Sequence, residues 1–574
     1  MIDKINFIIP SSYKRKTIII FLYLVFSMIL EALGLGMLFP VVKLILNPDI
    51  MNSYPLVADF FLGYGLDEHF KVVIFTMIVF ALVYVIKTFF LLYISWVIAD
   101  YSQGLSAKIS NDLFNGYIRQ PYINSLNSNS AHLQRNVTNE ILQFTAFITN
   151  ILFLISELSI TLSIVITLLF IEPIGAVWVI CILTAFSLGL YMLMKNYIFQ
   201  LGLDRLEYDQ KRTFTLIESL NGYKELKLFN KEFFFSNLFN SRNNKYYSAQ
   251  KKIQLTQQIP RLFIELFGVL GLSFFIVFSV LNGADISNLI AVLSVFLLAA
   301  FRLMPSFNRI LSNMQSVKYG SVAVNFLFKE LVNINLNNEV KNKPEIFFDI
   351  KEPIIIDKLS FKYPNTQEYV LENISVKIPF GSFVGIIGES GSGKSTFIDN
   401  LIGFLNPNSG EIKIGGKDIH KTPSLWMQNI GYVPQIIYLT DSSLRNNIAF
   451  GVEENEIDDE RILEVLKEAE LLDFVKSLSD GISTNVGQRG AKISGGQRQR
   501  IGIARALYND PKLLIFDEGT SALDSNTEQS IIKSILKFKN KKTIIMIAHR
   551  EKTISECETI LEFNNNKMIV KQNV

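Results

Sequence analysis

The residues with the clearest chemistry in this chain are the eight from Gly388 to Ser395, which read G-x-x-x-x-G-K-S. In this pattern the glycines let backbone N–H groups surround phosphate oxygens, Lys394 reaches the terminal phosphates, and Ser395 can ligate Mg²⁺. The apolar run 383–387 comes directly before the loop and a helix-compatible segment follows it, which is the strand–loop–helix context of a phosphate cradle. The pattern therefore predicts a site for a nucleoside triphosphate and Mg²⁺.

Two later segments add groups that could act on those phosphates. Ser494–Gln497 reads S-G-G-Q, and Ser494 is suited to cap a helix whose N-terminal N–H groups face a phosphate. The apolar run 513–516 is followed by two adjacent carboxylates, Asp517 and Glu518. A carboxylate at the end of a buried strand can hold Mg²⁺ opposite the phosphate-loop serine. The second carboxylate is then a candidate for the catalytic group.

The order of phosphate loop, S-G-G-Q and paired carboxylates resembles the ATPase domain of ABC transporters. The resemblance implies that Glu518 polarises the attacking water and that His549, in Ile547–Arg550, senses the terminal phosphate. It places Gln435 beside the metal and water, and Tyr363 beneath the adenine. It also implies that S-G-G-Q acts on the ATP of a second copy, so that a homodimer is expected.

This resemblance gives a complete set of expected site residues. The expected catalytic residues are Glu518 and His549, and the expected Mg²⁺ ligands are Ser395, Gln435 and Asp517. The residues expected to contact the nucleotide are Tyr363, Gly388, Glu389, Ser390, Gly391, Ser392, Gly393, Lys394, Ser395, Thr396, Gln435, Ser494, Gly495, Gly496 and Gln497.

The N-terminal part of the chain has the composition of a membrane domain. Of 574 residues 49% are hydrophobic and 46 are Phe, and two distant cysteines and four scattered histidines exclude a disulfide framework and a zinc cluster. Six apolar runs are long enough to cross a bilayer. They are residues 17–46, 71–98, 144–170, 174–199, 261–281 and 287–310.

Charge predicts how these spans are oriented. The connections between the second and third spans and between the fourth and fifth are rich in Lys and Arg, whereas segments 47–70, 171–173 and 282–286 contain none. The positive-inside rule then places both termini and the two long connections in the cytoplasm. The alternative is a soluble bundle of six buried helices. It would not explain why Lys and Arg are confined to alternate connections.

We therefore expect a six-helix α transmembrane domain of the ABC exporter type over 1–325, a linker over 326–349, and an α/β P-loop ATPase domain over 350–574. The strand-like runs Ile354–Leu359, Phe383–Gly388, Lys512–Asp517 and Thr543–Ala548 indicate a largely parallel sheet. By the same resemblance, breaks near 121–131 and 219–229 are coupling helices that press on ATPase domains, or else ordinary loops. Segment 50–63 is either an amphipathic surface helix or a loop.

Cationic residues within or next to the spans are candidates for substrate binding, because charges in hydrocarbon are costly. They are Lys87, Arg261, Arg302 and Arg309. Arg302 and Arg309 are seven residues apart, on one helix face and about 10 Å from each other, which would suit a pyrophosphate. The alternative is structural: Glu31 pairs with Lys87, and the arginines extend to the membrane surface.

The segments Ile259–Glu265 and Phe301–Ile310 look like those of bacterial ABC flippases of lipid-linked oligosaccharides. This resemblance implies an ATP-driven translocase of a polyprenyl-pyrophosphate glycan in the bacterial inner membrane, in contact with membrane lipids and with no nucleic-acid partner. Two alternatives stay open: an exporter of a drug, peptide or simple lipid, and a nucleotide-gated membrane protein that does not pump. The intact Glu518, His549 and S-G-G-Q count against the second.

Overall fold

The computed structural model describes two units of the chain. The described residues are 1–37, 69–126, 129–171, 173–281, 286–337, 348, 351–364, 366–487, 490–517, 525–548, 554–564 and 566–572. The first unit comprises Met1–Gln120 and Asn127–Glu339, and the second comprises Pro121–Leu126 and Val340–Val574. The possible amphipathic segment 50–63 lies outside the described residues.

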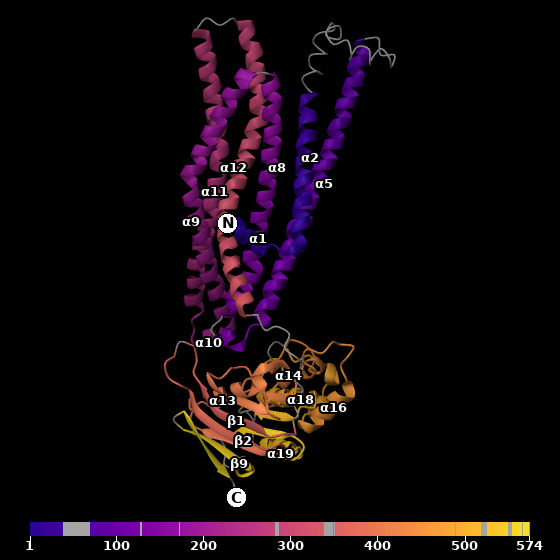
Figure 1. The fold of residues 1–574 in the computed structure, drawn as a ribbon, viewed down its shortest axis with the longest axis vertical. Coiled ribbons are helices and arrows are strands. Elements are labelled where there is room, and N and C mark those ends of the chain that lie inside the picture. Colours follow the sequence, from indigo (N-terminus) through magenta and orange to yellow (C-terminus); the bar gives the residue numbers. More distant parts are fainter. Residues whose placement is uncertain are drawn as a thin grey trace. The chain divides into compact units, whose positions relative to one another are not determined.

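The first unit is entirely helical where it is described (Figure 1). Its helices are α1 Ile2–Ile8, α2 Ser11–Gly36, α5 His69–Ile118, α7 Ser130–Arg135, the π-helix η2 Asn136–Glu140, α8 Ile141–Ile171, α9 Pro173–Asn221, α10 Tyr223–Leu228, α11 Glu232–Leu281 and α12 Ile286–Asn337. The six long ones contain the six predicted spans, except for residues 38–46 of the first, which lie outside the described part. The expected six-helix domain is confirmed.

Length and hydropathy independently mark three described stretches as able to cross a membrane: Ser11–Gly34, His69–Ile118 and Ala131–Ile166. Several helices also continue well beyond their predicted spans; α9 reaches Asn221 and α11 begins at Glu232. The two long connections are therefore mostly helix, as their low Pro and Gly content predicts.

The helices of this unit pack through apolar side chains and close backbone approaches. One core joins α1, α2, α5, α8 and α12 and includes Leu105, Phe144 and Leu327. Gly320 of α12 lies so near α8 that a Cβ atom there would sit 2.9 Å from the Cβ of Phe147. Any larger residue would push the two helices apart, because packed interiors leave no spare volume.

The linker begins later than its polar composition suggests. Helix α12 continues to Asn337, so residues 326–337 are helical rather than linker. The physical reason is burial: Leu327 and Ile334 are almost fully buried against neighbouring helices. Several Asn residues stand close to Ile334 in the sequence, and Asn has a low helix propensity. Burial of the apolar side chains stabilises the helix by more than the Asn residues destabilise it.

Short helices occur at both predicted breaks. Helix α6 Tyr122–Leu126 lies in the first break and α10 in the second. Helix α6 belongs to the same compact unit as the C-terminal part of the chain, whereas α10 belongs to the helical unit.

The second unit is an α/β domain with two sheets. Its strands are β1 Ile354–Phe361, β2 Leu371–Ile378, β3 Phe383–Gly388, β4 Ser409–Ile414, β5 Lys417–Asp418, β6 Ile430–Val433, β7 Leu513–Phe516, β8 Thr543–Ile547, β9 Thr559–Asn564 and β10 Lys567–Gln572. Its helices are α13 Lys394–Ile402, η3 Ile419–Lys421, α14 Pro423–Met427, α15 Leu444–Ile448, α16 Asp459–Glu468, α17 Leu472–Lys476, η4 Gly481–Ser483, α18 Gly495–Tyr508 and α19 Ser525–Leu536.

The larger sheet has the order β10-β9-β3-β8-β7-β6, and its pairs are parallel except for β10 with β9. Successive residues of β7 point into two different hydrophobic cores, one on each face of the sheet. Leu513 and Ile515 lie in one core, and Leu514 and Phe516 lie in the other. Burial of both faces explains the unbroken apolar runs of these strands. The predicted parallel sheet is confirmed.

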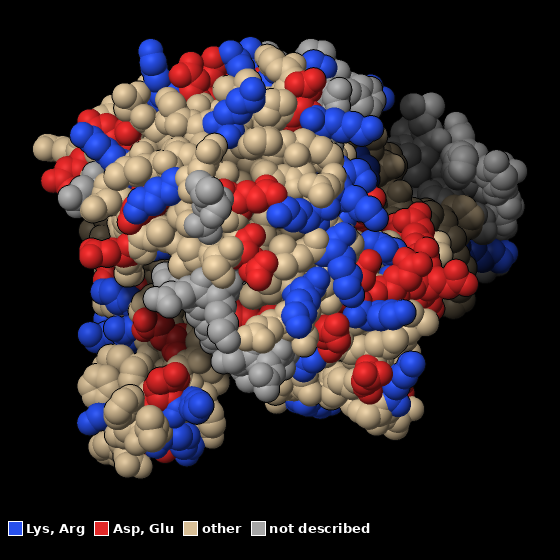
Figure 2. Space-filling view, turned by 90° about the horizontal axis from the view of Figure 1, so that it is seen from below, with Lys and Arg blue, Asp and Glu red and all other residues tan. Residues whose placement is uncertain are grey.

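The smaller sheet, β2-β1-β4-β5, is antiparallel, and the sequence did not predict it as a separate sheet. Its strands alternate buried and exposed residues, as half-buried antiparallel strands do. Figure 2 shows a face of the molecule on which acidic and basic side chains are mixed, in line with the formal net charge of +3.

Candidate nucleotide site and membrane cations

The phosphate loop lies between β3 and α13 at the carboxyl end of the larger sheet. Gly393, the residue before α13, has φ +100°, and a Cβ atom there would lie 2.9 Å from the Val370 carbonyl oxygen. A glycine is therefore required for the chain to enter the helix at this point. The crest of the loop, Glu389–Gly391, is exposed.

The loop has two features of a site prepared for an anion. The Lys394 ammonium is buried and donates to the carbonyl oxygens of Gly388 at 2.8 Å and Glu389 at 2.7 Å. The Ser392 hydroxyl oxygen is buried and has no hydrogen-bond partner among the described residues. Buried polar groups are normally hydrogen-bonded, so this hydroxyl and the α13 N-terminus fit a phosphate group well.

Tyr363 stands beside the loop. Its hydroxyl is 3.2 Å from the hydroxyl of Thr396, and its ring packs edge-on against Phe361. The structure thus brings Tyr363 to the phosphate-loop helix, although its expected stacking on adenine stays a prediction.

Two of the three expected metal ligands, Gln435 and Asp517, follow adjacent strands of the larger sheet. Strands β6 and β7 pair in parallel, and the Asp517 backbone N–H donates to the Val433 carbonyl oxygen at 2.9 Å. Gln435 follows β6 by two residues, so it leaves the sheet beside Asp517. Together with the Ser395 hydroxyl at the start of α13, these oxygens are of the kind that Mg²⁺ prefers. The residues fit the metal, whose charge would neutralise phosphate oxygens.

Two residues near this centre were missed in the sequence. The Tyr432 hydroxyl donates to Asp517 Oδ2 at 3.2 Å and so holds the carboxylate in place. Asp399, on α13, is half-buried, and burial together with the nearby Asp517 charge raises its pKa to about 6. The sequence gives no sign that either residue lies near Asp517. Their positions follow from the register of β6 with β7 and from the direction of α13.

The S-G-G-Q segment forms the N-terminus of α18, as predicted. The Ser494 hydroxyl accepts from the Gln497 backbone N–H, and the Gln497 side-chain oxygen accepts from the Ser494 N–H at 2.8 Å, a complete capping box. Ser494 and Gly495 are exposed. The helix therefore presents its N-terminal N–H groups outward.

The two expected catalytic residues lie outside the described part of the chain. Glu518 follows Asp517 directly, and His549 follows Ala548 at the end of β8. Strand β8 pairs in parallel with both β3 and β7, so the two strands that precede these residues in the sequence end at the same edge of the sheet as β3. Their roles stay predictions.

Three of the four candidate membrane cations have acidic partners. Lys87 of α5 lies 2.7 Å from Glu31 of α2, and both side chains are buried, so the ion pair of the alternative interpretation forms. Arg309 lies 2.6 Å from Glu157, a partner on α8 that the sequence did not suggest. The exposed Arg261 pairs with Glu265, one turn further along α11, at 3.1 Å.

The fourth cation, Arg302, has its backbone in α12 but its side chain lies outside the described residues. For the other three, a nearby carboxylate offsets the positive charge of each side chain. A role for any of them in binding substrate stays a proposal.

Both parts of the chain resemble known protein domains. Residues 371–521 match the family described as ABC transporter, and residues 20–303 match the ABC transporter transmembrane region. A solved structure of a bacterial Atm1-family ABC exporter with ATP bound has a similar fold, with a TM-score of 0.77 over 98% of this chain and 96% of that chain, at 22% identity.

Similar proteins differ in what their names say they carry. The ATP-dependent lipid A-core flippase of Cupriavidus pinatubonensis is 26% identical over 82% of this chain and 81% of its own length. That of Francisella novicida is 33% identical over 62% of this chain and 60% of its own length. The sophorolipid transporter of Starmerella bombicola is 34% identical over 50% of this chain. The chain spans less than two thirds of the last two, and only 23% of the sophorolipid transporter.

Proposed function

Because the chain belongs to the ABC transporter family, we propose that it is one half of a homodimeric, ATP-driven flippase. Its substrate is a polyprenyl-pyrophosphate-linked oligosaccharide, moved across the bacterial inner membrane, with both termini in the cytoplasm. ATP drives the movement by binding one conformation more tightly than the other.

The main structural support for an ATP-driven movement is the contact between α6 and the ATPase domain. The Tyr122 ring lies 4.9 Å from that of Phe404, and Ile123 packs against the same core. Phe404 lies two residues after the end of α13, and its backbone N–H donates to the Asp399 carbonyl oxygen. Since α13 begins at Lys394 in the phosphate loop, one short helix links the nucleotide site to a segment of the membrane-domain connection.

This contact predicts that Tyr122→Ala weakens coupling more than ATP hydrolysis. An aromatic pair is worth about 1 kcal/mol, so we expect about a fivefold loss of substrate-stimulated ATP turnover, with basal turnover within about twofold of the native protein. The measurement is ATP turnover in proteoliposomes with and without substrate. Tyr122→Phe keeps the ring and should behave like the native protein. Equal loss of basal and stimulated turnover would show a general defect instead.

The names of the two flippases support a lipid substrate, and the position of Arg302 supports an anionic head group. A charged residue within a membrane helix is a candidate for binding an oppositely charged group, because an ionised side chain in hydrocarbon is costly. The observed pairs of Lys87, Arg261 and Arg309 favour the rival, an exporter of an uncharged lipid or drug, because they leave little free positive charge.

Transport in proteoliposomes decides between them. Arg302→Gln should lower the rate of flipping of a fluorescent lipid-linked glycan by at least tenfold, equivalent to about 1.4 kcal/mol, and should leave transport of a neutral fluorescent drug unchanged. Lys318→Gln, a matched loss of one positive charge further along α12, should affect neither. Transport of the drug alone by the native protein would establish the rival function.

A further inference from the structure

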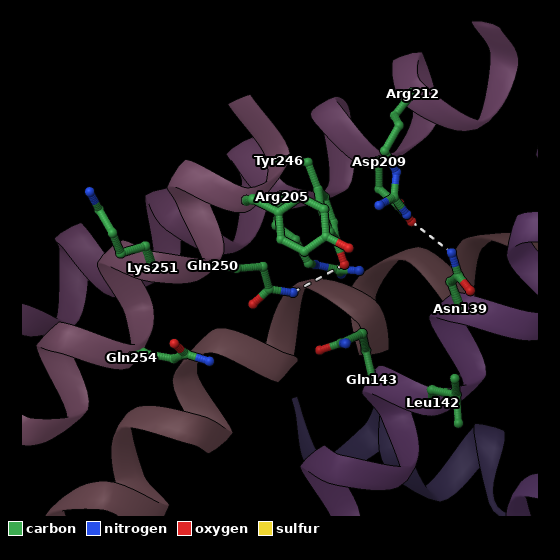
Figure 3. A pocket seen from close by; sticks show the side chains of 11 residues that line it. Asn139, Leu142, Gln143, Arg205, Asp209, Arg212, Tyr246, Gln250, Lys251 and Gln254 are labelled. Atoms are coloured by element: carbon green, nitrogen blue, oxygen red, sulfur yellow. Dashed lines mark hydrogen bonds and ion pairs between the residues drawn. The ribbon is translucent and has the colours of Figure 1, made fainter. Parts of the chain in front are cut away.

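A cavity of about 610 Å³ lies in the helical unit, between the start of α8 with η2, and helices α9 and α11 (Figure 3). None of its lining residues belongs to the second unit or is one of the four candidate cations. Nothing in the ATPase chemistry uses it.

Carboxamide side chains from two sides line this cavity: Asn139 and Gln143 from one, Gln250 and Gln254 from the other. Within the described part of the chain, the side chains of Gln143 and Gln254 make no hydrogen bond, and that of Gln250 donates to the Tyr246 hydroxyl at 3.1 Å. A carboxamide offers two donors and an acceptor together. Such groups match hydroxyls, each of which also donates and accepts.

Most of the charged side chains that line the cavity are paired with a side chain of opposite charge. Arg205 makes two 3.1 Å hydrogen bonds to Glu140, both side chains being buried, and Arg212 lies 2.7 Å from Asp209. Lys251 is the one lining cation of the described chain without an acidic partner. A wall of this kind offers little to a multiply charged anion, and suits a neutral or weakly charged polar ligand.

Two further features indicate a ligand site. The buried Arg205 Nε has no hydrogen-bond partner among the described residues, although its residue lines the cavity. The π-helix η2 carries Asn139 and Glu140, and single π-turns occur often at functional sites. Tyr246 and Tyr247 add aromatic surface, and the Arg212 guanidinium lies 4.0 Å over the ring of Tyr246.

The cavity lies within reach of a head group anchored in the membrane. Along α11 its residues from Gln254 to Tyr246 are about 10–22 Å from Arg261, at about 1.5 Å per residue, and the fifth predicted span begins at Arg261. Gln143 lines it one residue before the third predicted span. An oligosaccharide of a few sugar units, attached to a lipid pyrophosphate at the start of the span, is long enough to reach the cavity.

We propose that this cavity binds the glycan part of the substrate before it is flipped. The proposal rests on the proposed function and deepens it: the carboxamides hold sugar hydroxyls, and the tyrosines cover the less polar faces of the rings. The polyprenyl-pyrophosphate part is bound elsewhere.

The test uses the full-length protein in nanodiscs and two probes that stimulate ATP turnover: lipid-linked oligosaccharide extracted from bacterial membranes, and undecaprenyl pyrophosphate without glycan. For Gln250→Ala with Gln254→Ala, the half-maximal concentration of the glycan-bearing probe should rise roughly tenfold. The value for the glycan-free probe should not change. Gln257→Ala is the matched control, because Gln257 lies on α11 but bonds Ser316 instead of lining the cavity.

An unchanged response to both probes, or an equal shift for both, would overturn the glycan site while leaving the flippase function intact. No stimulation of the native protein by either probe would overturn the proposed function itself. If the double variant fails to assemble, Gln254→Ala alone carries the test, because Gln254 is exposed and its loss leaves no buried gap.

Discussion

Replacing Glu518 by Gln is expected to lower steady-state ATP turnover by about 10²- to 10⁴-fold, the usual contribution of a general base. Gln keeps the size and hydrogen-bonding capacity of the side chain but cannot take up the proton of the attacking water. Asp517, held by Tyr432 and by the β6 backbone, should still support binding of Mg²⁺ and ATP. The variant should therefore bind ATP with near-native affinity.

The measurements are phosphate release by the purified protein and binding of a fluorescent ATP analogue. Glu556→Gln is the control, since Glu556 is an exposed carboxylate of the same domain. Turnover retained within tenfold of the native rate would remove Glu518 from the role of catalytic base.

Co-expression of two inactive variants, which allows mixed dimers to form, is expected to restore ATP turnover. Lys394→Ala removes the phosphate-loop cation, and Ser494→Arg blocks the N-terminus of α18; each homodimer should be inactive. If each ATP lies between the phosphate loop of one copy and the S-G-G-Q of the other, a mixed dimer carries both defects at one site and none at the second. With random pairing in a symmetric dimer, roughly a quarter of the native sites are intact.

The two variants should be co-expressed with different affinity tags, so that the mixed dimer is isolated before turnover is measured. A mixture of separately purified, non-exchanging homodimers is the control and should stay inactive. An isolated mixed dimer without activity, or native turnover by a strictly monomeric protein, would contradict the shared site.

Local features were predictable because neighbouring residues determine them. The phosphate loop needs glycines at fixed positions, the capping box needs Ser494 and Gln497 three residues apart, and the spans need only apolar length. The pair of Lys87 with Glu31 was foreseeable because both are charges within apolar runs, where an unpaired ion is costly.

Features that depend on tertiary packing were not predictable. Glu157 pairs with Arg309 because α8 packs beside α12, and Glu140 of η2 pairs with Arg205 of α9. The bond from Tyr432 to Asp517 depends on the register of β6 with β7. The linker was expected from residue 326, whereas α12 continues to Asn337, because burial of a few apolar residues stabilises the helix despite a run of polar residues.

The capping box of α18 also determines how readily its serine can recognise a second molecule. A hydroxyl has one hydrogen and two lone pairs, and in the cap the Ser494 oxygen uses a lone pair to accept from the Gln497 N–H. Its hydrogen stays available for an incoming oxyanion. If, as proposed, this helix contacts the nucleotide of a second copy, that contact requires neither unwinding of the helix nor loss of a hydrogen bond within the cap. Association and dissociation of the two copies would then be fast and reversible.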